Sequence, residues 1–154
     1  MAYLEGVNKI NYDQKLFGVF ELKNLDPTHP IIGELDDVFY CPQSRHAGIA
    51  DKDMEKAAED GRLKLLAYGP QAGYTIFSTV DDRFIAHTGH PEYNATRLAD
   101  EAKRDKAYIY FLKNSFDNAK KYIDDISKLK EDDFFGYNIK GLIYLKNNNF
   151  HEAK

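Results

Sequence analysis

The chain has 154 residues, of which 43% are hydrophobic and 30% charged, and its formal net charge is −4. This length and composition are ordinary for a globular protein with one domain or two small ones. Nucleic acids and anionic membranes are bound through basic surfaces, so the acidic balance argues against both as the main partner. No apolar run approaches the roughly 20 residues that a membrane-spanning helix needs.

The compartment is indicated by cysteine usage and by the N-terminal residues. Cys41 is the single cysteine, so the chain has no intramolecular disulfide. The segment MAYLEGVNK lacks the basic stretch followed by an apolar run that is typical of a secretion signal. Both features suit a reducing environment, and we expect a cytoplasmic protein.

An α/β pattern occupies residues 16–93, where short apolar runs alternate with turn residues. A short helix is expected at MEKAAEDG (54–61), ended by Gly61, and Asn94 is a candidate cap for a helix that starts near Ala95. The expected strands are LFGVFEL (16–22), DDVFYC (36–41), KLLAYG (64–69), YTIFSTV (74–80) and DRFIAHTG (82–89).

The sequence changes character near residue 105, after which it has no strand pattern and no proline. IYFLKNSFDNAK (109–120) aligns without a gap with IYLKNNNFHEAK (143–154), an offset of 34 residues. The small residues Ala107 and Gly141 precede the two copies at the same spacing. This pattern resembles the tetratricopeptide repeat, in which small residues allow close helix approach and aromatic residues fill the gap between helices. Two ordinary amphipathic helices that are alike by chance are the alternative.

Ionisable residues gather where the last strand gives way to a helix, in HTGHPEYNATRLADEAKRD (87–105). His90 follows the strand, and Glu92 lies two residues on, within reach to orient an imidazole in the manner of a catalytic triad. Glu101 and Arg104 are three apart and so share one helix face, where they could hold the amine and carboxylate of an amino acid. On spacing alone, a surface histidine in a turn and a routine ion pair are the commoner explanation.

The remaining candidates are weaker on pattern alone. Lys15 and Ser44 flank expected strands, and a solvated lysine and a loop serine are their ordinary roles. Cys41 ends a strand before a proline, without the glycine-flanked turn of a nucleophile. The sequence has no zinc-ligand spacing and no glycine-rich phosphate loop, so we expect neither a metal nor a bound cofactor. Surface or core-edge positions are expected for His46, His87 and His151.

Three motifs together resemble the homoserine O-succinyltransferases and O-acetyltransferases of methionine biosynthesis: KLFGVFE (15–21), LDPTHPIIGELDDVFYCPQSRH (25–46) and the segment 87–105. The resemblance covers about residues 3–105 and implies a partial three-layer α/β domain of the glutamine-amidotransferase-like class. The all-α helical-repeat tail follows it. The expected domains are therefore 1–105 and 106–154.

The resemblance implies ping-pong acyl transfer, in which a cysteine takes the acyl group from succinyl-CoA or acetyl-CoA and homoserine then removes it. His90 matches the catalytic histidine and Glu92 the acid that orients it. Arg104 matches the arginine that binds the amino-acid carboxylate, and Glu101 lies where the amine would be met. The remaining active-site lysine and serine match Lys15 and Ser44. The acyl-CoA is a co-substrate rather than a cofactor, and the family suggests a homodimer.

The family's nucleophilic cysteine lies upstream of the segment that YLEGVNK (3–9) resembles, so the chain is expected to be a fragment without it. Because triad members act as a unit, such a chain should be inactive by itself. Gln43 and Leu22 stand where the family commonly has histidine. The alternative function is a non-enzymatic interaction module, whose helical tail binds a protein partner beside a relic of the α/β domain. A fusion of two fragments, joined near residues 103–106, is a third possibility.

Overall fold

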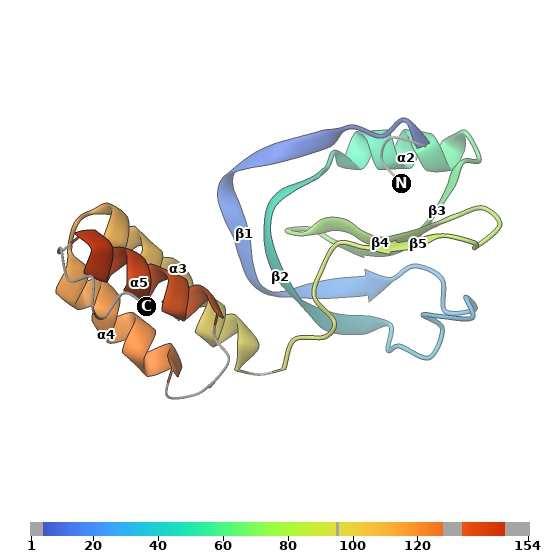
Figure 1. Ribbon diagram of the computed structural model, residues 1–154. Coiled ribbons are helices and arrows are strands. Elements are labelled where there is room, and N and C mark those ends of the chain that lie inside the picture. The colour runs from blue at the N-terminus through green and yellow to red at the C-terminus, as the bar shows by residue number, and fades with distance from the viewer. Residues whose placement is uncertain (1–4, 95, 128–133, 147–154) are drawn as a thin grey trace. The chain divides into compact units, whose positions relative to one another are not determined.

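The computed structural model describes residues 5–94, 96–127 and 134–146 (Figure 1). The chain divides into two compact units, a sheet unit of residues 1–93 and a helical unit of residues 94–154, and each is described by itself. Among the described residues, no helix combines the length and the apolar character that crossing a membrane requires.

The sheet unit is built on an antiparallel sheet with the strand order β2-β1-β3-β4-β5. Every expected strand is present, and β1 and β2 are longer than predicted, because they pair with each other and bend together as one ribbon (Figure 1). The strands are β1 (Lys9–Asn24), β2 (Val38–Ile49), β3 (Leu63–Gly69), β4 (Gly73–Thr79) and β5 (Ile85–His87). A mixed α/β class is thus confirmed, while the three-layer arrangement stays a prediction.

A wide bulge interrupts the β1–β2 ribbon. Asn11 pairs with Ala47, and the next pair joins Leu16 to Arg45. More residues of β1 than of β2 therefore lie between these two pairs. Extra residues of this kind are left out of the ladder and bend the strand locally. Lys15 lies in the bulge, directly before the ladder resumes.

Helix α2 (Asp51–Glu59) corresponds to the predicted MEKAAEDG helix and begins three residues earlier. Gly61 ends it as expected: its φ of 71° lies in the left-handed region, and the Arg62 amide donates back to the Ala57 carbonyl. Met54 and Ala57 are fully buried on one face of α2 and pack with Val7, Leu63 and Phe77. Their burial attaches α2 to the sheet.

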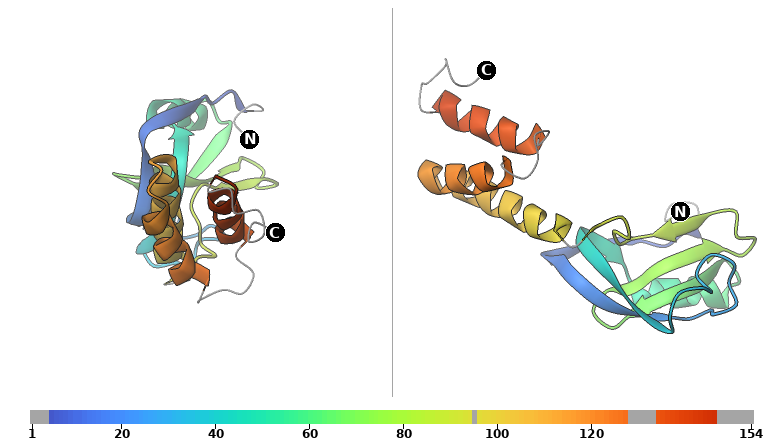
Figure 2. Two further views of the ribbon diagram at one scale, coloured as in Figure 1. Left: turned by 60° about the vertical axis from the view of Figure 1, so that its left-hand side comes forward. Right: turned by 90° about the horizontal axis from the view of Figure 1, so that it is seen from below.

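The helical unit contains α3 (Arg97–Leu112), α4 (Phe116–Ser127) and α5 (Phe134–Lys146), which pack on one another (Figure 2). Helix α3 runs unbroken through residues 103–106, as the sequence allows, so the expected boundary at 105/106 falls inside a helix and stays a prediction. Thr96, not Asn94 as predicted, is the N-cap residue of this helix, and its side chain makes no capping hydrogen bond. The Asn94 side-chain oxygen accepts the Arg97 amide at 3.0 Å from the turn that precedes the helix. The helix itself begins at Arg97.

One apolar cluster holds the helical unit together: Ala107, Phe111, Ala119, Ile123, Ile139 and Ile143. Ala107 and Ala119 have no exposed surface, as expected of small residues where helices approach closely. Much of the second repeat copy, residues 147–154, lies outside the described residues. The tetratricopeptide assignment therefore stays a prediction.

Candidate functional site

The turn that carries His90 is held by backbone contacts to two different strands. β5 ends at His87, and the Thr88 amide then donates to the Thr75 carbonyl of β4 at 2.9 Å. The His90 amide donates to the Pro42 carbonyl of β2 at 2.8 Å. The turn is therefore fixed from both sides, and the His90 side chain starts from a defined backbone position.

His90 and Glu92 form the acid–imidazole pair that the sequence predicts. His90 Nδ1 lies 2.8 Å from Glu92 Oε1, and the two side chains remain 31% and 64% exposed. The hydrogen bond from His90 lowers the pKa of Glu92, so its carboxylate is ionised at neutral pH. With Nδ1–H donating to this carboxylate, Nε2 keeps the lone pair that a general base uses.

Tyr93 is a member of this site that the sequence analysis did not identify. Its ring stacks on the His90 imidazole, with centroids 4.3 Å apart and planes 14° from parallel. The Tyr93 amide donates to the His90 carbonyl at 3.1 Å, closing the turn. An aromatic residue three positions after a turn histidine is the signal that could have indicated the stack.

Glu101 and Arg104 meet on α3 as their spacing predicts, with Arg104 Nη2 2.8 Å from Glu101 Oε1. The Glu101 side chain is 9% exposed, so this ion pair is more sheltered than an ordinary surface pair. Asp105, which the sequence analysis gave no role, also accepts from Arg104, at 3.3 Å from Nε and 3.2 Å from Nη2. The guanidinium thus lies between two carboxylates.

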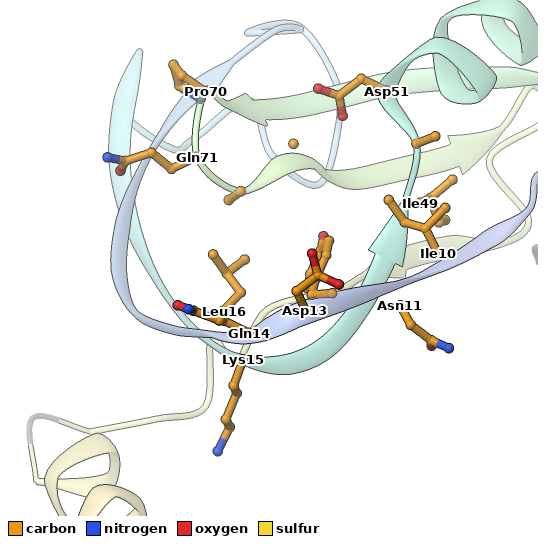
Figure 3. Close-up of a pocket in the computed structure, with 14 residues that line it drawn as sticks. Ile10, Asn11, Asp13, Gln14, Lys15, Leu16, Ile49, Asp51, Pro70 and Gln71 are labelled. Atoms are coloured by element: carbon orange, nitrogen blue, oxygen red, sulfur yellow. The ribbon is translucent and has the colours of Figure 1, made fainter.

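Lys15 and Ser44 lie near each other on the β1–β2 ribbon. Ser44 pairs with Phe17 in the ladder, and the Lys15 ammonium lies 4.8 Å from the centre of the Phe17 ring. A pocket of about 640 Å³ opens beside the bulge, lined by β1, the start of α2 and the β3–β4 turn (Figure 3). Lys15 borders this pocket, but its ammonium points away from the interior that Asp13 and Leu16 face (Figure 3).

The six predicted site residues fall into local groups. His90 with Glu92, and Lys15 with Ser44, belong to the sheet unit, whereas Glu101 and Arg104 belong to the helical unit. Within the described ranges, no group of three or more histidine, cysteine, aspartate or glutamate side chains could hold a metal ion. A histidine paired with a carboxylate has the chemistry of a general base, and an arginine beside a glutamate has that of an amino-acid clamp.

Comparison with known proteins connects the chain to one family. The model of the homoserine O-succinyltransferase family matches residues 1–138. A homoserine O-acetyltransferase of Clostridium beijerinckii is 38% identical over 131 residues, which are 83% of this chain and 40% of the relative. One from Bacteroides thetaiotaomicron is 40% identical over 100 residues, 65% of this chain and 32% of the relative. The chain thus spans well under half the length of these relatives.

The structural comparison supports the predicted glutamine-amidotransferase-like fold. A crystal structure from Thermoplasma acidophilum, of a protein proposed to be part of a GMP synthase, matches with a TM-score of 0.50 and 15% identity. The match covers 82% of this chain and 55% of the other.

The family match is longer than the sequence motifs indicated. It continues past residue 105, through α3 and α4 and into α5, so much of the helical segment is part of what the family shares. The chain belongs to the homoserine O-succinyltransferase family.

Proposed function

We propose that this chain supplies the general base and the amino-acid clamp of an acyl-CoA-dependent homoserine O-acyltransferase of methionine biosynthesis. The observation that carries the proposal is the 2.8 Å contact of His90 Nδ1 with Glu92 Oε1 in a member of this family. Relatives that are 38–40% identical are named homoserine O-acetyltransferases, which supports the same reaction class.

In this proposal His90 moves the proton of the acceptor hydroxyl. Glu92 fixes the ring with Nδ1–H toward itself, so Nε2 takes the proton as the homoserine oxygen attacks the acyl carbonyl. The thiolate that leaves then accepts that proton from Nε2. The products are O-acylhomoserine and a free thiol, and Glu92 stabilises the transient imidazolium.

The Glu101–Arg104 pair would bind the amino-acid end of homoserine. The guanidinium of Arg104 suits a carboxylate, with which it forms paired hydrogen bonds, and Glu101 suits an ammonium. Since Glu101 is 9% exposed, its charge is held against Arg104 before the ligand arrives. When homoserine binds as a zwitterion, its carboxylate pairs with Arg104 and its ammonium pairs with Glu101. Two ion pairs then replace one, and no charge is left unpaired.

The thiol nucleophile of the ping-pong reaction would come from outside these 154 residues. Cys41 is the only cysteine, it is 3% exposed, and burial raises the pKa of its thiol. A nucleophilic cysteine needs the opposite, an accessible thiol with a lowered pKa. The external thiol would attack the acyl-CoA thioester and release CoA, and homoserine would then attack the new thioester.

Lys15 and Ser44 complete the proposed substrate site, on the strength of their family positions and their shared place on the β1–β2 ribbon. Either succinyl-CoA or acetyl-CoA suits this scheme as the acyl donor. A homodimer in the cytoplasm is the setting that the family resemblance and the single cysteine favour.

The test combines mass spectrometry with calorimetry. The intact chain should gain no acyl adduct from either acyl-CoA, and it should bind L-homoserine. Arg104→Ala should weaken binding at least about tenfold, since a hydrogen-bonded charge contributes on the order of 1.5–3 kcal/mol. Arg97→Ala, an exposed arginine on the same helix, is the matched control and should bind normally.

Two results would count against this scheme. An acyl group on Cys41 would show that the nucleophile lies within the chain. Homoserine binding that is absent, or unchanged by Arg104→Ala, would remove the clamp.

Protein binding by the helical unit is the second candidate function. α3 exposes three neighbouring apolar side chains: Tyr108, Ile109 and Leu112 are 44%, 49% and 59% exposed. Such a stripe would suit a helical-repeat surface that binds a partner. If this function is correct, residues 94–154 should fold and bind protein without the sheet unit. Leu112→Glu should then abolish that binding. Unfolding of the isolated segment would exclude it.

A further inference from the structure

A compact cluster lies beneath the turn that carries His90. It consists of Cys41 and Gln43 on β2, His87 at the end of β5, and Gly89 in the turn itself. A methyl group on Gly89 would overlap the Gln43 amide nitrogen and lie 2.7 Å from Cys41 Sγ and 3.0 Å from the Pro42 carbonyl. The turn therefore packs directly on β2, and only glycine allows this approach.

The hydrogen bond from Gly89 determines the tautomer of His87. The Gly89 amide donates to His87 Nδ1 at 3.0 Å, so Nδ1 must carry a lone pair and Nε2 must carry the proton. His87 is exposed on one side, so the contact with the Gly89 amide is the main support for the neutral ring, and the partial desolvation that lowers the pKa of His87 acts in the same direction. Asn and Asp side chains stabilise turns in the same way, by accepting a hydrogen bond from the backbone amide two residues later.

The other side of the His87 ring faces Cys41. Nε2, which carries the proton, lies 3.9 Å from Cys41 Sγ, so the ring donates weakly toward sulfur and cannot take the thiol proton. The thiol in turn donates to the Pro42 carbonyl at 3.5 Å. The same carbonyl accepts the His90 amide at 2.8 Å. A continuous series of contacts thus leads from His87 through Cys41 and Pro42 to His90.

We propose that His87 is a positioning residue for His90, with its Nδ1 holding the Gly89 amide so that the turn directs the His90 ring at Glu92. Cys41 lies beside the Nε2 edge of the His87 ring and has no catalytic part. The inference rests on the proposed function, because it concerns the presentation of the proposed base. Neither residue was assigned a role by the sequence motifs.

The test uses ¹H–¹⁵N NMR on the intact chain, without substrate, to determine which ring nitrogens of His87 and His90 carry a proton. In the unaltered protein His87 should be the Nε2–H tautomer, and His90 should show an Nδ1–H proton signal that disappears in Glu92→Ala. His87→Leu removes the acceptor and should abolish the His90 Nδ1–H signal. His87→Asn should restore it, because the amide oxygen can accept the Gly89 amide at the same spacing. The exposed His46 provides the control His46→Leu, which should change nothing.

Three results would overturn the inference. The first is an Nδ1–H tautomer for His87 in the unaltered protein, which needs no variant to detect. The second is a His90 signal that persists in His87→Leu, and the third is failure of His87→Asn in a protein whose β1–β2 amide signals are intact. Failure of homoserine binding would instead refute the proposed function and leave this result standing, because the NMR signals report geometry alone.

Discussion

The sheet unit and the helical unit each hold a pair of ionisable groups together, and they do so by different means. Glu101 and Arg104 meet because residues three apart on a helix share a face, which is a property of the local chain. His90 and Glu92 are only two residues apart, but their turn is fixed by carbonyls of Thr75 and Pro42, far away in sequence. Local geometry can be predicted from spacing, whereas the turn depends on the whole sheet.

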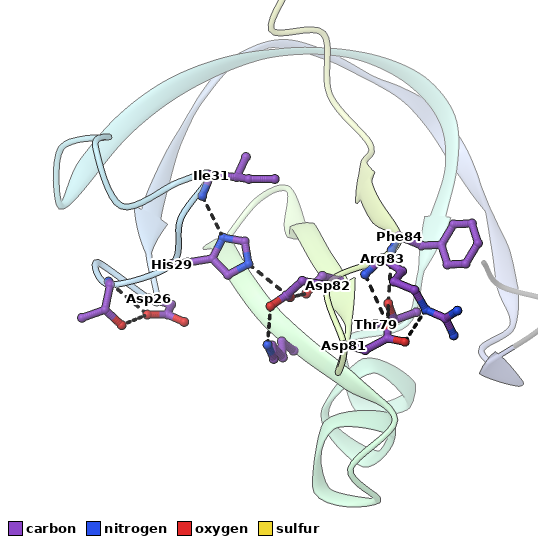
Figure 4. A network of polar contacts seen from close by, with 11 residues as sticks. Asp26, His29, Ile31, Thr79, Asp81, Asp82, Arg83 and Phe84 are labelled. Carbon is purple, nitrogen blue, oxygen red and sulfur yellow. Dashed lines mark hydrogen bonds and ion pairs between the residues drawn. The ribbon is translucent and has the colours of Figure 1, made fainter.

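The two units also differ in how they are stabilised. Among the described residues, the buried apolar side chains of the helical unit form one cluster, while those of the sheet unit form several smaller clusters. One network of polar contacts in the sheet unit centres on Asp82, which accepts from Lys64 Nζ at 2.5 Å and Ser78 Oγ at 2.7 Å (Figure 4). His29 Nε2 lies 3.2 Å from Asp82 Oδ1, and this contact joins the loop after β1 to the β4–β5 turn (Figure 4).

The strongest test of this contrast is Ile123→Ala. Ile123 is 1% exposed within the single apolar cluster, so truncation leaves a cavity that costs about 2–5 kcal/mol. Urea unfolding followed by circular dichroism at 222 nm should show this loss. Leu142→Ala, at a side chain that is 39% exposed, should cost roughly 0.5 kcal/mol or less. Equal losses would contradict the single-cluster account.

Gly89→Ala should have the next largest effect, because the added methyl group overlaps Gln43 and Cys41. Overpacking of this kind costs about 1–3 kcal/mol and should displace the turn, with loss of the His90 Nδ1–H signal. The comparison is Gly61→Ala, where the φ of 71° is strained but no atom lies within 4 Å. That variant should lose stability and keep the signal. A preserved signal in Gly89→Ala would mean that the turn is not packed as described.

A smaller, pH-dependent effect is expected for Asp82→Asn. The hydrogen bond from Lys64, with those from Ser78 and His29, lowers the pKa of Asp82 below its usual range. Its stabilisation is therefore fully present above the unfolded-state pKa of about 3.9 and is lost as the pH falls toward the lowered folded value. Urea midpoints of the two proteins should differ at pH 7 and converge below about pH 4. A difference that stays constant down to pH 2 would argue against ionic anchoring by Asp82.

The smallest effect concerns the ion pair between Lys140 Nζ and Asp124 Oδ1, which are 2.7 Å apart. The side chains are 30% and 43% exposed, so water and salt screen the attraction. A double-mutant cycle with Lys140→Met and Asp124→Asn should give a coupling of about 0.2–1 kcal/mol that declines with added salt. A salt-insensitive coupling of roughly 2 kcal/mol or more would show that the helical unit also depends on polar anchors.

Much of the fold could be predicted because apolar runs and turn residues mark the strands. The early part of β1 could not, since KINYDQK has only Ile10 and Tyr12 in alternation with polar residues and becomes a strand by pairing with β2. β2 continues through Pro42, which the sequence suggests as a strand end. It is tolerated there because β2 lies at the edge of the sheet, where a strand can lack one amide donor.

The candidate site was predictable to the extent that it is local. The pairs His90–Glu92 and Glu101–Arg104 follow from spacing and were predicted. Asp105 was missed because adjacent helix residues do not normally face each other, and here the long arginine side chain bends back to reach it. The contact of His87 with Cys41 depends on the approach of the end of β5 to β2, which one sequence does not reveal.

An NMR titration of the chain with L-homoserine shows whether Glu101 and Arg104 hold the amino-acid end of this ligand. We expect the Arg104 Nε–H signal to shift saturably, because the guanidinium turns from Glu101 to the carboxylate of homoserine. Glu101→Gln should weaken the binding, and Arg97→Ala should preserve it. An Arg104 signal that does not respond to homoserine, or that responds equally in Glu101→Gln, would refute the clamp.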